Sequence, residues 1–399
     1  MIRVALLTDN DFTKVNGVTT TLKAVLQYAP EDIAARVYTM SDTEVVADRY
    51  TAWRSFGVGL PWYSQMRIHW PRLRCLSAAL RAQQPQLLHL TTPGPVGLAG
   101  RYLAFRHHWR TVGSFHTNLG DYARALGGGS VAGRGAGLWL DAYMRWLYRS
   151  SDRVLVPSDQ TRHDLIEQGY DPQRLTVWTR GVDAHQFSPL RRSNALRSIW
   201  KASLGCPVLL YVGRLSREKG LHRLVSVSDR LTSLGVRFQL VIAGDGPMRD
   251  ALVARLPAAH FVGELPHAKV GEAMASADVF VFPSDTDTFG NVVLEAQASG
   301  LPAVVTTCGG PREAMVDGRT GFACDGDAIE VFAAHLARLL TDAELRRQFS
   351  EDARTQAEGR DWHHALAPLY DGWRASARLA ALSPYIASSS SIATGDGRP

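Results

Sequence analysis

Two acidic side chains bracket an apolar run in the C-terminal third of the sequence. The stretch PSDTDTFGNVVLEAQASGLP, residues 283–302, places Asp287 and Glu295 eight positions apart. They could act as an acid/base pair, but the carboxyls of a glycosidase stand roughly 5–10 Å apart across the scissile bond, and nothing in this spacing demands that arrangement. Asp285 and Asp287 also match a DxD metal motif, and a solvated helix face is a third interpretation.

The elements on either side favour a fourth interpretation. DVFVFPS is typical of a buried strand, and the following NVVLEAQASG is typical of a helix. The backbone N–H groups of Phe289, Gly290 and Asn291 would then lie at a helix N-terminus, where anions bind. Glu295 would face the same side one turn further on. Since carboxylates accept hydrogen bonds from sugar hydroxyls, the stretch as a whole fits a nucleotide diphosphate with a sugar at each end.

Two cations that follow another strand could bind the same ligand. Arg214 and Lys219 lie five positions apart in GRLSREKG, directly after VLLYV. Arginine can bind a phosphate through two parallel hydrogen bonds, and lysine can act as a point charge. The alternative is a pair of solvated cations, but a position at the carboxyl edge of a sheet favours a diphosphate. Gly17, expected at the start of a helix, would let further backbone N–H groups approach an anion.

Other polar residues after strands leave alternatives open. His116 follows TVGSF, and it is either a structural histidine or one that points into the same cleft. Asp9 and Asp11 form a second, short DxD, for which loop and cap roles are favoured over a metal site.

Strand-like and helix-like segments alternate along the chain, which predicts an α/β fold with parallel, doubly wound sheets. The pattern restarts after GVDAHQFSPLRR, so we place a domain boundary near residues 186–196. We expect an N-terminal domain over 1–190, a C-terminal domain over 191–360, a helix over 361–383 and a disordered tail over 384–399. Ligands of such folds bind at the carboxyl ends of the strands, so the site is expected between the two domains.

Cysteine usage and hydropathy bound the environment of the chain. Four scattered cysteines without a CxxC pair argue against a zinc site or a disulfide framework, and they favour reduced thiols. No stretch approaches the roughly 20 apolar residues of a membrane span, and the N-terminus is typical of a strand rather than of a signal peptide. We expect a cytoplasmic protein.

The net charge of +6 is concentrated in the first half. Residues 1–190 hold 21 Lys and Arg against 15 Asp and Glu, whereas residues 191–399 hold 23 of each. Residues 49–120 contain nine arginines, several aromatic residues and no acid. This mixture could meet an anionic membrane surface or a nucleic acid, or it could be a solvated face. No RNA-binding signature is present, so we expect no nucleic acid partner.

Six motifs in order give the chain a family resemblance over about residues 1–380. They are VNGV (15–18), FHTN (115–118), GRLSREKG (213–220), AGDGP (243–247), DTFGNVVLE (287–295) and GGPRE (309–313). Together they resemble the retaining family-4 glycosyltransferases, whose GT-B fold has two facing Rossmann-like domains. VNGVTTTL, LTTPGPVGL and SFHTNLGDYARALG are most similar to the branch that holds bacterial GDP-mannose-dependent α-mannosyltransferases. The first acid of the family motif is usually Glu, and Asp287 is one methylene shorter.

The resemblance implies a role for each matching residue. Arg214 and Lys219 would bind the donor diphosphate, and Gly17 would let the N-domain loop close over it. Glu295 would hold the ribose, and His116 would sit beside the anomeric carbon. Asp287 and the backbone from Thr288 to Asn291 (through Phe289 and Gly290) would hold the transferred sugar and phosphate. The departing phosphate would accept the acceptor's proton, so no metal or other cofactor is expected.

The resemblance also sets the expected partners and the alternatives. The chain would transfer a hexose, mannose from GDP-mannose in the first instance, to a lipid or glycan acceptor. A UDP-sugar-dependent glucosyl- or sulfoquinovosyl-transferase to diacylglycerol lies in the same neighbourhood. A nucleotide-sugar epimerase, a phosphorylase and a non-catalytic sugar-nucleotide binding protein are the alternatives from other classes. Because the acceptor side is the N-domain, the basic stretch predicts peripheral contact with the inner face of a membrane.

Overall fold

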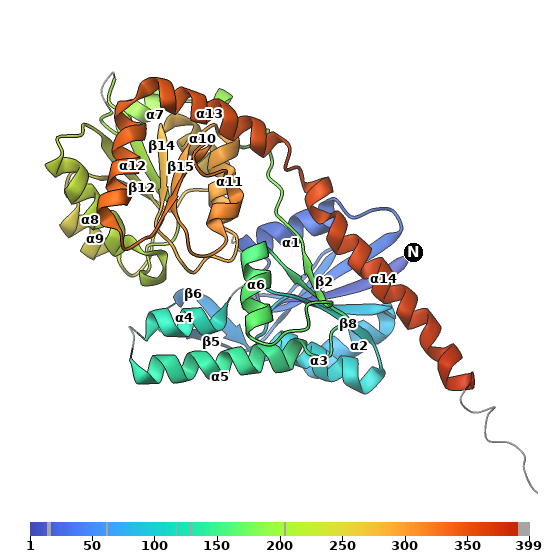
Figure 1. The fold of residues 1–399 in the computed structure, drawn as a ribbon. Coiled ribbons are helices and arrows are strands. Elements are labelled where there is room, and N and C mark those ends of the chain that lie inside the picture. Colours follow the sequence, from blue (N-terminus) through green and yellow to red (C-terminus); the bar gives the residue numbers. More distant parts are fainter. Residues whose placement is uncertain (14–16, 61–62, 117, 128–129, 203–204, 390–399) are drawn as a thin grey trace, which may run out of the picture.

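Two parallel β-sheets, each with its own helices, make up the chain (Figure 1). The computed structural model describes residues 1–13, 17–60, 63–116, 118–127, 130–202 and 205–389. Val15 and Asn16 of the VNGV motif, Thr117 of FHTN and the last ten residues of the predicted tail therefore lie outside the described residues. The expected α/β fold with doubly wound sheets is confirmed.

The first sheet has the spatial order β10-β9-β8-β7-β1-β2-β4-β3, and only the β3–β4 pairing is antiparallel. A separate antiparallel hairpin, β5–β6, stands beside it. The strands are β1 (Ile2–Leu7), β2 (Ile33–Ser41), β3 (Val45–Val46), β4 (Tyr50–Arg54), β5 (Gly57–Leu60), β6 (Tyr63–His69), β7 (Leu87–Leu90), β8 (Arg110–Ser114), β9 (Arg153–Val156) and β10 (Leu175–Val177).

The helices of the first half surround this sheet. Helix α4 packs on α5 and also contacts the C-terminal half. The helices are α1 (Gly17–Gln27), α2 (Leu73–Gln83), α3 (Pro95–His107), α4 (Leu119–Leu126), α5 (Val131–Tyr148) and α6 (Asp159–Glu167).

The second sheet is wholly parallel, in the order β13-β12-β11-β14-β15-β16. Its strands are β11 (Val208–Val212), β12 (Gln239–Ala243), β13 (His260–Gly263), β14 (Val279–Phe282), β15 (Ala303–Thr306) and β16 (Gly321–Cys324). Its helices are η1 (Pro189–Arg191), α7 (Asn194–Ile199), η2 (Arg217–Lys219), α8 (Leu221–Ser233), α9 (Arg249–Arg255), α10 (His267–Ser276), α11 (Asn291–Ala298), η3 (Pro311–Ala314), α12 (Ile329–Thr341) and α13 (Ala343–Glu358).

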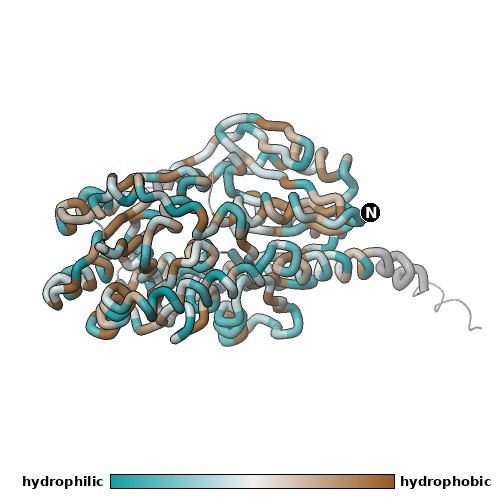
Figure 2. The backbone as a smooth tube through the Cα atoms, turned by 90° about the horizontal axis from the view of Figure 1, so that it is seen from above, coloured by the Kyte–Doolittle hydropathy of each residue, from teal (hydrophilic) through white to brown (hydrophobic). Residues whose placement is uncertain are grey.

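The central strands are buried on both faces, as a sheet covered by helices on each side requires. Each residue of β14, VFVF, is buried, and the four residues of β7 and of β15 are buried as well. Brown and teal residues are interleaved along the surrounding helices in Figure 2, which fits helices that bury one face. Four short strands between Val45 and His69 are not apparent in the sequence pattern, because their side chains alternate less regularly and two of them form an isolated hairpin.

The last helix, α14 (Trp362–Ser389), returns from the C-terminal half and packs on the first sheet. Trp373 is fully buried there, and its indole Nε1 donates to Nδ1 of His89 at 3.2 Å. The Tyr370 hydroxyl donates to the carbonyl of Val25 at 2.9 Å. The helix continues to Ser389, so residues 384–389 are helical, whereas we expected a disordered tail from residue 384.

Candidate functional site

The second sheet changes its direction of winding between β11 and β14. From β11 the order runs outward to β12 and β13 on one side and to β14, β15 and β16 on the other. Arg214 follows β11, and the PSDTDTFG loop follows β14, so both lie at the carboxyl side of this switch point. Switch points are where doubly wound folds bind their ligands.

Lys219 and Asp287 meet in this site although 68 residues separate them. The Lys219 ammonium donates to both carboxylate oxygens of Asp287, at 2.8 and 2.9 Å. The Ser284 hydroxyl donates to the same carboxylate at 2.6 Å. The side chains of Lys219 and Asp287 are 14% and 21% exposed, so water screens the pair only partly. The sequence pattern predicted that both residues lie at this sheet edge, but it did not predict their pairing.

The two carboxylates of the DxD motif at Asp285 and Asp287 do not converge on one point. Asp285 forms an ion pair with Arg223, whose guanidinium also holds Asp327, whereas Asp287 binds Lys219. The described part of the chain contains no group of three or more His, Cys, Asp or Glu side chains arranged to hold a metal ion. The arrangement therefore favours ion pairing over the metal interpretation of this motif.

The N-terminus of α11 is shaped by a glycine in the left-handed region. Gly290 has φ +77°, and a Cβ there would lie 3.0 Å from the Pro311 ring. The Phe289 side chain is buried in the core, so only its backbone can serve the site. No described group accepts a hydrogen bond from the N–H of Phe289 or Gly290. Asn291 opens the helix, and binding of an anion by these N–H groups stays a prediction.

Glu295 is held by a histidine that sequence reasoning missed. His267 Nε2 lies 3.1 Å from Oε1 of Glu295, and Gln186 Nε2 lies 2.8 Å from Nδ1 of the same ring. The hydrogen bond and the charge of Glu295 raise the pKa of His267 above its usual range, despite the opposing effect of burial. This imidazole fixes the orientation of the carboxylate that was assigned to the ribose.

His116 is half-buried, and its imidazole is neutral. Its Nδ1 lies 3.3 Å from the Arg180 guanidinium, which can only donate, so Nδ1 accepts and Nε2 carries the proton. Burial, with the charge of Arg180 as a smaller cause, holds the pKa of His116 well below its usual value. Nε2 has no partner among the described residues, so its N–H can donate to a ligand. Burial also lowers the pKa of Arg180 to about 9.

The two halves meet beside His116. Thr288 Oγ1 donates to the carbonyl of His116 at 2.8 Å, and Ser158 Oγ donates to the carbonyl of Thr288 at 3.0 Å. A Cβ placed on Gly17 would lie 3.7 Å from Nδ2 of Asn291, so the start of α1 stands against the start of α11. The predicted residues His116, Gly17, Thr288 and Asn291 therefore gather at one place.

A second contact between the halves uses the GGPRE motif. The carboxylate of Glu313 accepts hydrogen bonds from the backbone N–H groups of Asp159 and Gln160, at 2.9 and 2.7 Å. These N–H groups open α6, so the carboxylate also faces the positive end of the helix dipole. The motif thus joins the C-terminal half to the N-terminal half.

Tyr122, on α4, lies near Asp287 and Glu218 from the N-terminal half. Burial raises the pKa of its hydroxyl, and the charges of Asp287 and Glu218 raise it further. Helix α4 contacts η2, the turn that ends at Lys219. The sequence shows Tyr122 within SFHTNLGDYARALG, but nothing in its local pattern predicts this position.

Asp9 caps the start of helix α3. It is buried, and its carboxylate accepts from the Thr92 hydroxyl at 2.6 Å and from the N–H of Val96 at 2.7 Å, at the start of α3. Burial raises its pKa, while these hydrogen bonds act in the opposite direction. The cap role considered for this motif fits the structure.

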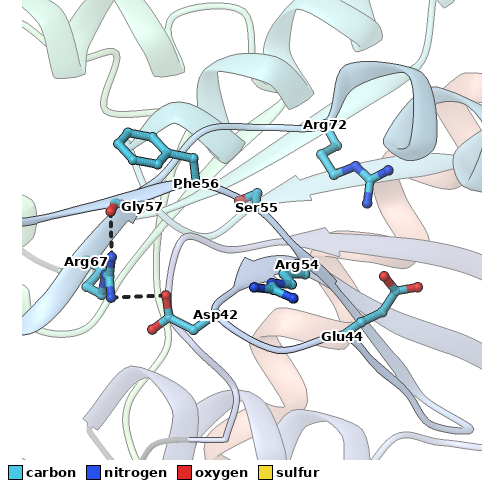
Figure 3. A pocket seen from close by; sticks show the side chains of 8 residues that line it. All are labelled: Asp42, Glu44, Arg54, Ser55, Phe56, Gly57, Arg67 and Arg72. Atoms are coloured by element: carbon cyan, nitrogen blue, oxygen red, sulfur yellow. Dashed lines mark hydrogen bonds and ion pairs between the residues drawn. The ribbon is translucent and has the colours of Figure 1, made fainter.

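A cavity of about 800 Å³ lies at the carboxyl edge of the first sheet (Figure 3). Asp42 follows β2, and Arg54 ends the parallel strand β4, so the cavity opens on the same sheet edge as His116, which follows β8. Figure 3 shows Arg67 bound both to Asp42 and to the carbonyl of Gly57. Part of the basic stretch 49–120 thus lines a cavity that also carries acids. The lining residues are Asp42, Glu44, Arg54, Ser55, Phe56, Gly57, Arg67 and Arg72.

Two family models match the chain in succession. The model described as Glycosyltransferase Family 4 matches residues 15–186, and the model described as Glycosyl transferases group 1 matches residues 193–356.

Curated relatives match over most of their length. A GDP-mannose-dependent alpha-mannosyltransferase of Mycobacterium tuberculosis is 34% identical over 379 residues, which cover 90% of this chain and 93% of the relative. A sulfoquinovosyl transferase of Arabidopsis thaliana is 30% identical over 379 residues, which cover 92% of this chain and 72% of that protein.

Solved structures share the fold at low sequence identity. A sucrose-phosphate synthase from Thermosynechococcus elongatus has a TM-score of 0.76 at 19% identity, covering 96% of this chain and 100% of that one. HepE from Anabaena, in complex with UDP and glucose, has a TM-score of 0.73 at 17% identity, covering 93% and 99%. Both align across the two halves together, which confirms the expected GT-B fold of two Rossmann-like domains.

Proposed function

The chain belongs to glycosyltransferase family 4 and is a hexosyltransferase that uses a nucleotide-sugar donor. We propose that it transfers mannose from GDP-mannose, with retention, to a glycan or a glycolipid. The relatives named as GDP-mannose-dependent mannosyltransferases support the choice of donor, since two of them match about 90% of the chain.

The observation that carries the proposal is the convergence of cations and helix N–H groups at one switch point. Arg214 and Lys219 follow β11, and the start of α11 follows β14, so these donors lie on the carboxyl side of the switch point and would bind a diphosphate there. Asp287 lies before α11 and Glu295 lies within it, so we assign Asp287 to the transferred sugar and Glu295 to the ribose. Preorganised donors of this kind stabilise the negative charge that develops on a departing phosphate. In this role the two cations supply the electrostatic stabilisation, and we propose that no metal ion or other cofactor is needed.

In the proposed reaction, the bond from the anomeric carbon to the diphosphate oxygen breaks, and the acceptor hydroxyl forms its bond on the same face. The acceptor's proton moves to the departing phosphate oxygen, so no side chain has to act as a base. The neutral His116 then contributes as a hydrogen-bond donor through Nε2 rather than as a proton carrier. Asp287, held by Lys219 and Ser284, is placed to accept hydrogen bonds from the sugar hydroxyls.

The acceptor is assigned to the N-terminal half. The cavity lined by Asp42, Arg54, Phe56 and Arg67 supports this, because carboxylates, guanidinium groups and an aromatic ring suit a polar headgroup that carries hydroxyls or phosphate. Among the described residues, no helix is both long and apolar enough to cross a bilayer.

A donor panel tests the proposal. Thermal unfolding is measured with GDP-mannose, UDP-glucose, UDP-N-acetylglucosamine and UDP-sulfoquinovose, since a ligand at about 100 times its Kd adds about 2.7 kcal/mol to stability. The donor that stabilises the protein is then incubated with lipid and glycan acceptors, and the anomeric configuration of the product is read by NMR. Stabilisation by a UDP-sugar alone would overturn the GDP-mannose assignment, and an inverted product would overturn retention.

A further inference from the structure

Arg180 is a buried arginine to which the described residues offer no carboxylate partner. It follows strand β10 and is only 3% exposed. Burial lowers the pKa of its guanidinium to about 9, and no described acid acts on that pKa in the opposite direction. A charge that is taken out of water without an opposite charge beside it destabilises the folded state. A cation held in this way next to a cleft indicates a function for its charge.

Neutral groups surround this guanidinium, in contrast to the cation of the donor loop. Lys219 is paired with Asp287, whereas Arg180 donates through Nη1 to the carbonyl of Trp178 at 3.1 Å. The centre of the Trp178 ring lies 4.2 Å from the guanidinium carbon. A carbonyl oxygen and the face of an aromatic ring stabilise a cation, but they leave its full charge in place. The charge of Arg180 is therefore available to whatever it faces.

The guanidinium is directed at the imidazole of His116. Nη2 of Arg180 lies 3.3 Å from Nδ1 of His116, and the ring of Trp178 stands edge-on to the imidazole with the ring centres 5.7 Å apart. A guanidinium has only N–H groups, so Nδ1 accepts and the imidazole proton is on Nε2. Nε2 is buried and has no partner among the described residues, so the chain of contacts ends at an N–H that is free for a ligand.

The backbone around this contact is fixed by the last helix and by the other half of the chain. A Cβ on Gly181, the next residue after the arginine, would lie 2.6 Å from Cα of Trp362 at the start of α14. The N–H of Val182 donates to the carbonyl of Arg360 at 3.0 Å. The carbonyl of the histidine accepts from Thr288 Oγ1. The guanidinium and the imidazole are therefore held in place before a substrate binds.

We propose that Arg180 is a positioning residue for the transfer reaction, which holds His116 permanently as a hydrogen-bond donor and strengthens that donor with its charge. A cation at Nδ1 withdraws electron density from the ring, so the N–H at Nε2 becomes a stronger donor. The inference deepens the proposed function, and it rests on that function in that the oxygen which meets Nε2 belongs to the nucleotide sugar.

This arrangement also assigns the proton of the acceptor. Because Nε2 carries a proton already and Nδ1 is occupied by Arg180, neither nitrogen of His116 can take up another proton from an acceptor hydroxyl. The departing phosphate is left to accept it, as the proposed reaction requires. An oxygen that gains negative charge during the reaction would be favoured by the positive charge behind the ring.

The sequence analysis did not single out Arg180. It lies in LTVWTRGVD, residues 175–183, where nothing in the local pattern distinguishes it from a solvated arginine after a strand. Its burial and its contact with a histidine 64 positions away depend on the tertiary structure.

Thermal unfolding separates a functional charge from a structural one. Arg180→Met keeps much of the side-chain length and removes a buried charge, so the melting temperature should equal that of the wild type or exceed it by a few degrees. Arg197→Met is the matched control, because Arg197 is 13% exposed and is paired with Asp278. Breaking this pair leaves a partly buried carboxylate short of a partner, so the melting temperature of the control should fall.

The tautomer of His116 gives a second readout, which needs neither donor nor acceptor. Long-range proton–nitrogen NMR spectra of the full chain distinguish a protonated ring nitrogen from an unprotonated one, and the signal of His116 is assigned by its absence in His116→Ala. We expect the wild type to carry the proton on Nε2 only. Arg180→Met should show both tautomers, and Arg180→Lys, which keeps a charged donor, should restore the wild-type pattern.

Turnover is measured as release of GDP from GDP-mannose, with a bacterial lipid extract as the acceptor. Arg180→Met should lower kcat roughly 2- to 13-fold, the range for the loss of one neutral hydrogen bond. In the His116→Ala background the same substitution should have little further effect, because Arg180 acts through the histidine. Arg180→Lys should recover most of the rate, and Arg197→Met should keep the kcat of the wild type.

Several results would overturn the proposal. An unchanged tautomer in Arg180→Met would show that the guanidinium does not fix the imidazole. A melting temperature that falls as far as in Arg197→Met, with an unchanged kcat, would make Arg180 a structural residue. An equal loss of kcat with and without His116 would show that it acts elsewhere. A failure of the wild type to release GDP contradicts the choice of donor instead, since the tautomer and the melting temperature are measured without one.

Discussion

Removing the ammonium of Lys219 separates its contribution to donor binding from its contribution to structure. Lys219→Met keeps most of the side-chain volume and removes the charge that binds both oxygens of Asp287. Hydrogen bonds to charged groups contribute about 1.5–3 kcal/mol, which corresponds to roughly 10- to 150-fold in affinity. If Lys219 binds the diphosphate, calorimetry should show the affinity for GDP and for GDP-mannose falling by this factor.

The same substitution should destabilise the protein only moderately. Exposed ion pairs contribute about 0–1 kcal/mol and the breaking of a buried pair costs about 3–5 kcal/mol. With 14% and 21% exposure this pair lies between those limits, and the Ser284 hydroxyl remains to bind Asp287. We expect a loss of about 1–2 kcal/mol in urea unfolding. Lys219→Arg, which keeps the charge, should retain most of the affinity.

One combination of results would refute this reasoning. If Lys219→Met lowers stability as expected but leaves the Kd for GDP within about twofold of the wild type, the lysine is a structural partner of Asp287 and does not bind the diphosphate. A double variant with Asp287→Asn would then show the coupling in stability alone.

Three further predictions concern His116, Glu313 and His89. His116→Ala should lower kcat roughly 2- to 13-fold, because it removes one neutral hydrogen bond that contributes about 0.5–1.5 kcal/mol. The Kd for the donor should be unchanged in calorimetry, and normal turnover would remove the histidine from the catalytic assignment. Glu313→Ala removes both acceptors at the start of α6, so small-angle scattering should show a larger radius of gyration, and kinetics should show a lower kcat/KM. An unchanged scattering profile and an unchanged rate would show that the contact does not hold the two halves together. Burial lowers the pKa of His89 to about 3, so the folded state binds fewer protons than the unfolded state below pH 6.5, and stability is lost as the pH falls. Urea unfolding should show a loss of roughly 2 kcal/mol from this group between about pH 6.5 and 5, and His89→Asn should flatten the dependence; an equally steep decline in that variant would assign the effect to other groups.

Local patterns were sufficient for the architecture. The parallel strands of both sheets, except β4 and β16, were predicted as buried apolar runs with turns on either side, and helix α11 was predicted to follow β14 directly. These predictions succeeded because the period of apolar residues and the position of glycine act over a few residues. The carboxyl ends of parallel strands also share one edge of the sheet. The sequence pattern could therefore predict that Arg214, Asp287 and Glu295 belong to one site, although it did not predict their contacts.

The pairing of side chains across that site could not be predicted. Lys219 binds Asp287 68 positions away, Arg180 fixes the tautomer of His116 across 64 positions, and Glu313 reaches Gln160 across 153. Each pairing depends on the relative placement of segments that no local pattern encodes. The desolvation that keeps the His116 imidazole neutral also depends on the relative placement of these segments.

The sequence by itself therefore determined the two-sheet fold, the order of its motifs and the kind of ligand that the strand ends receive. The tertiary structure alone decided which charged side chains pair with one another within the site, such as Lys219 with Asp287. It also decided which side of each helix is buried, because packing a helix against a sheet buries one side and leaves the other side to solvent.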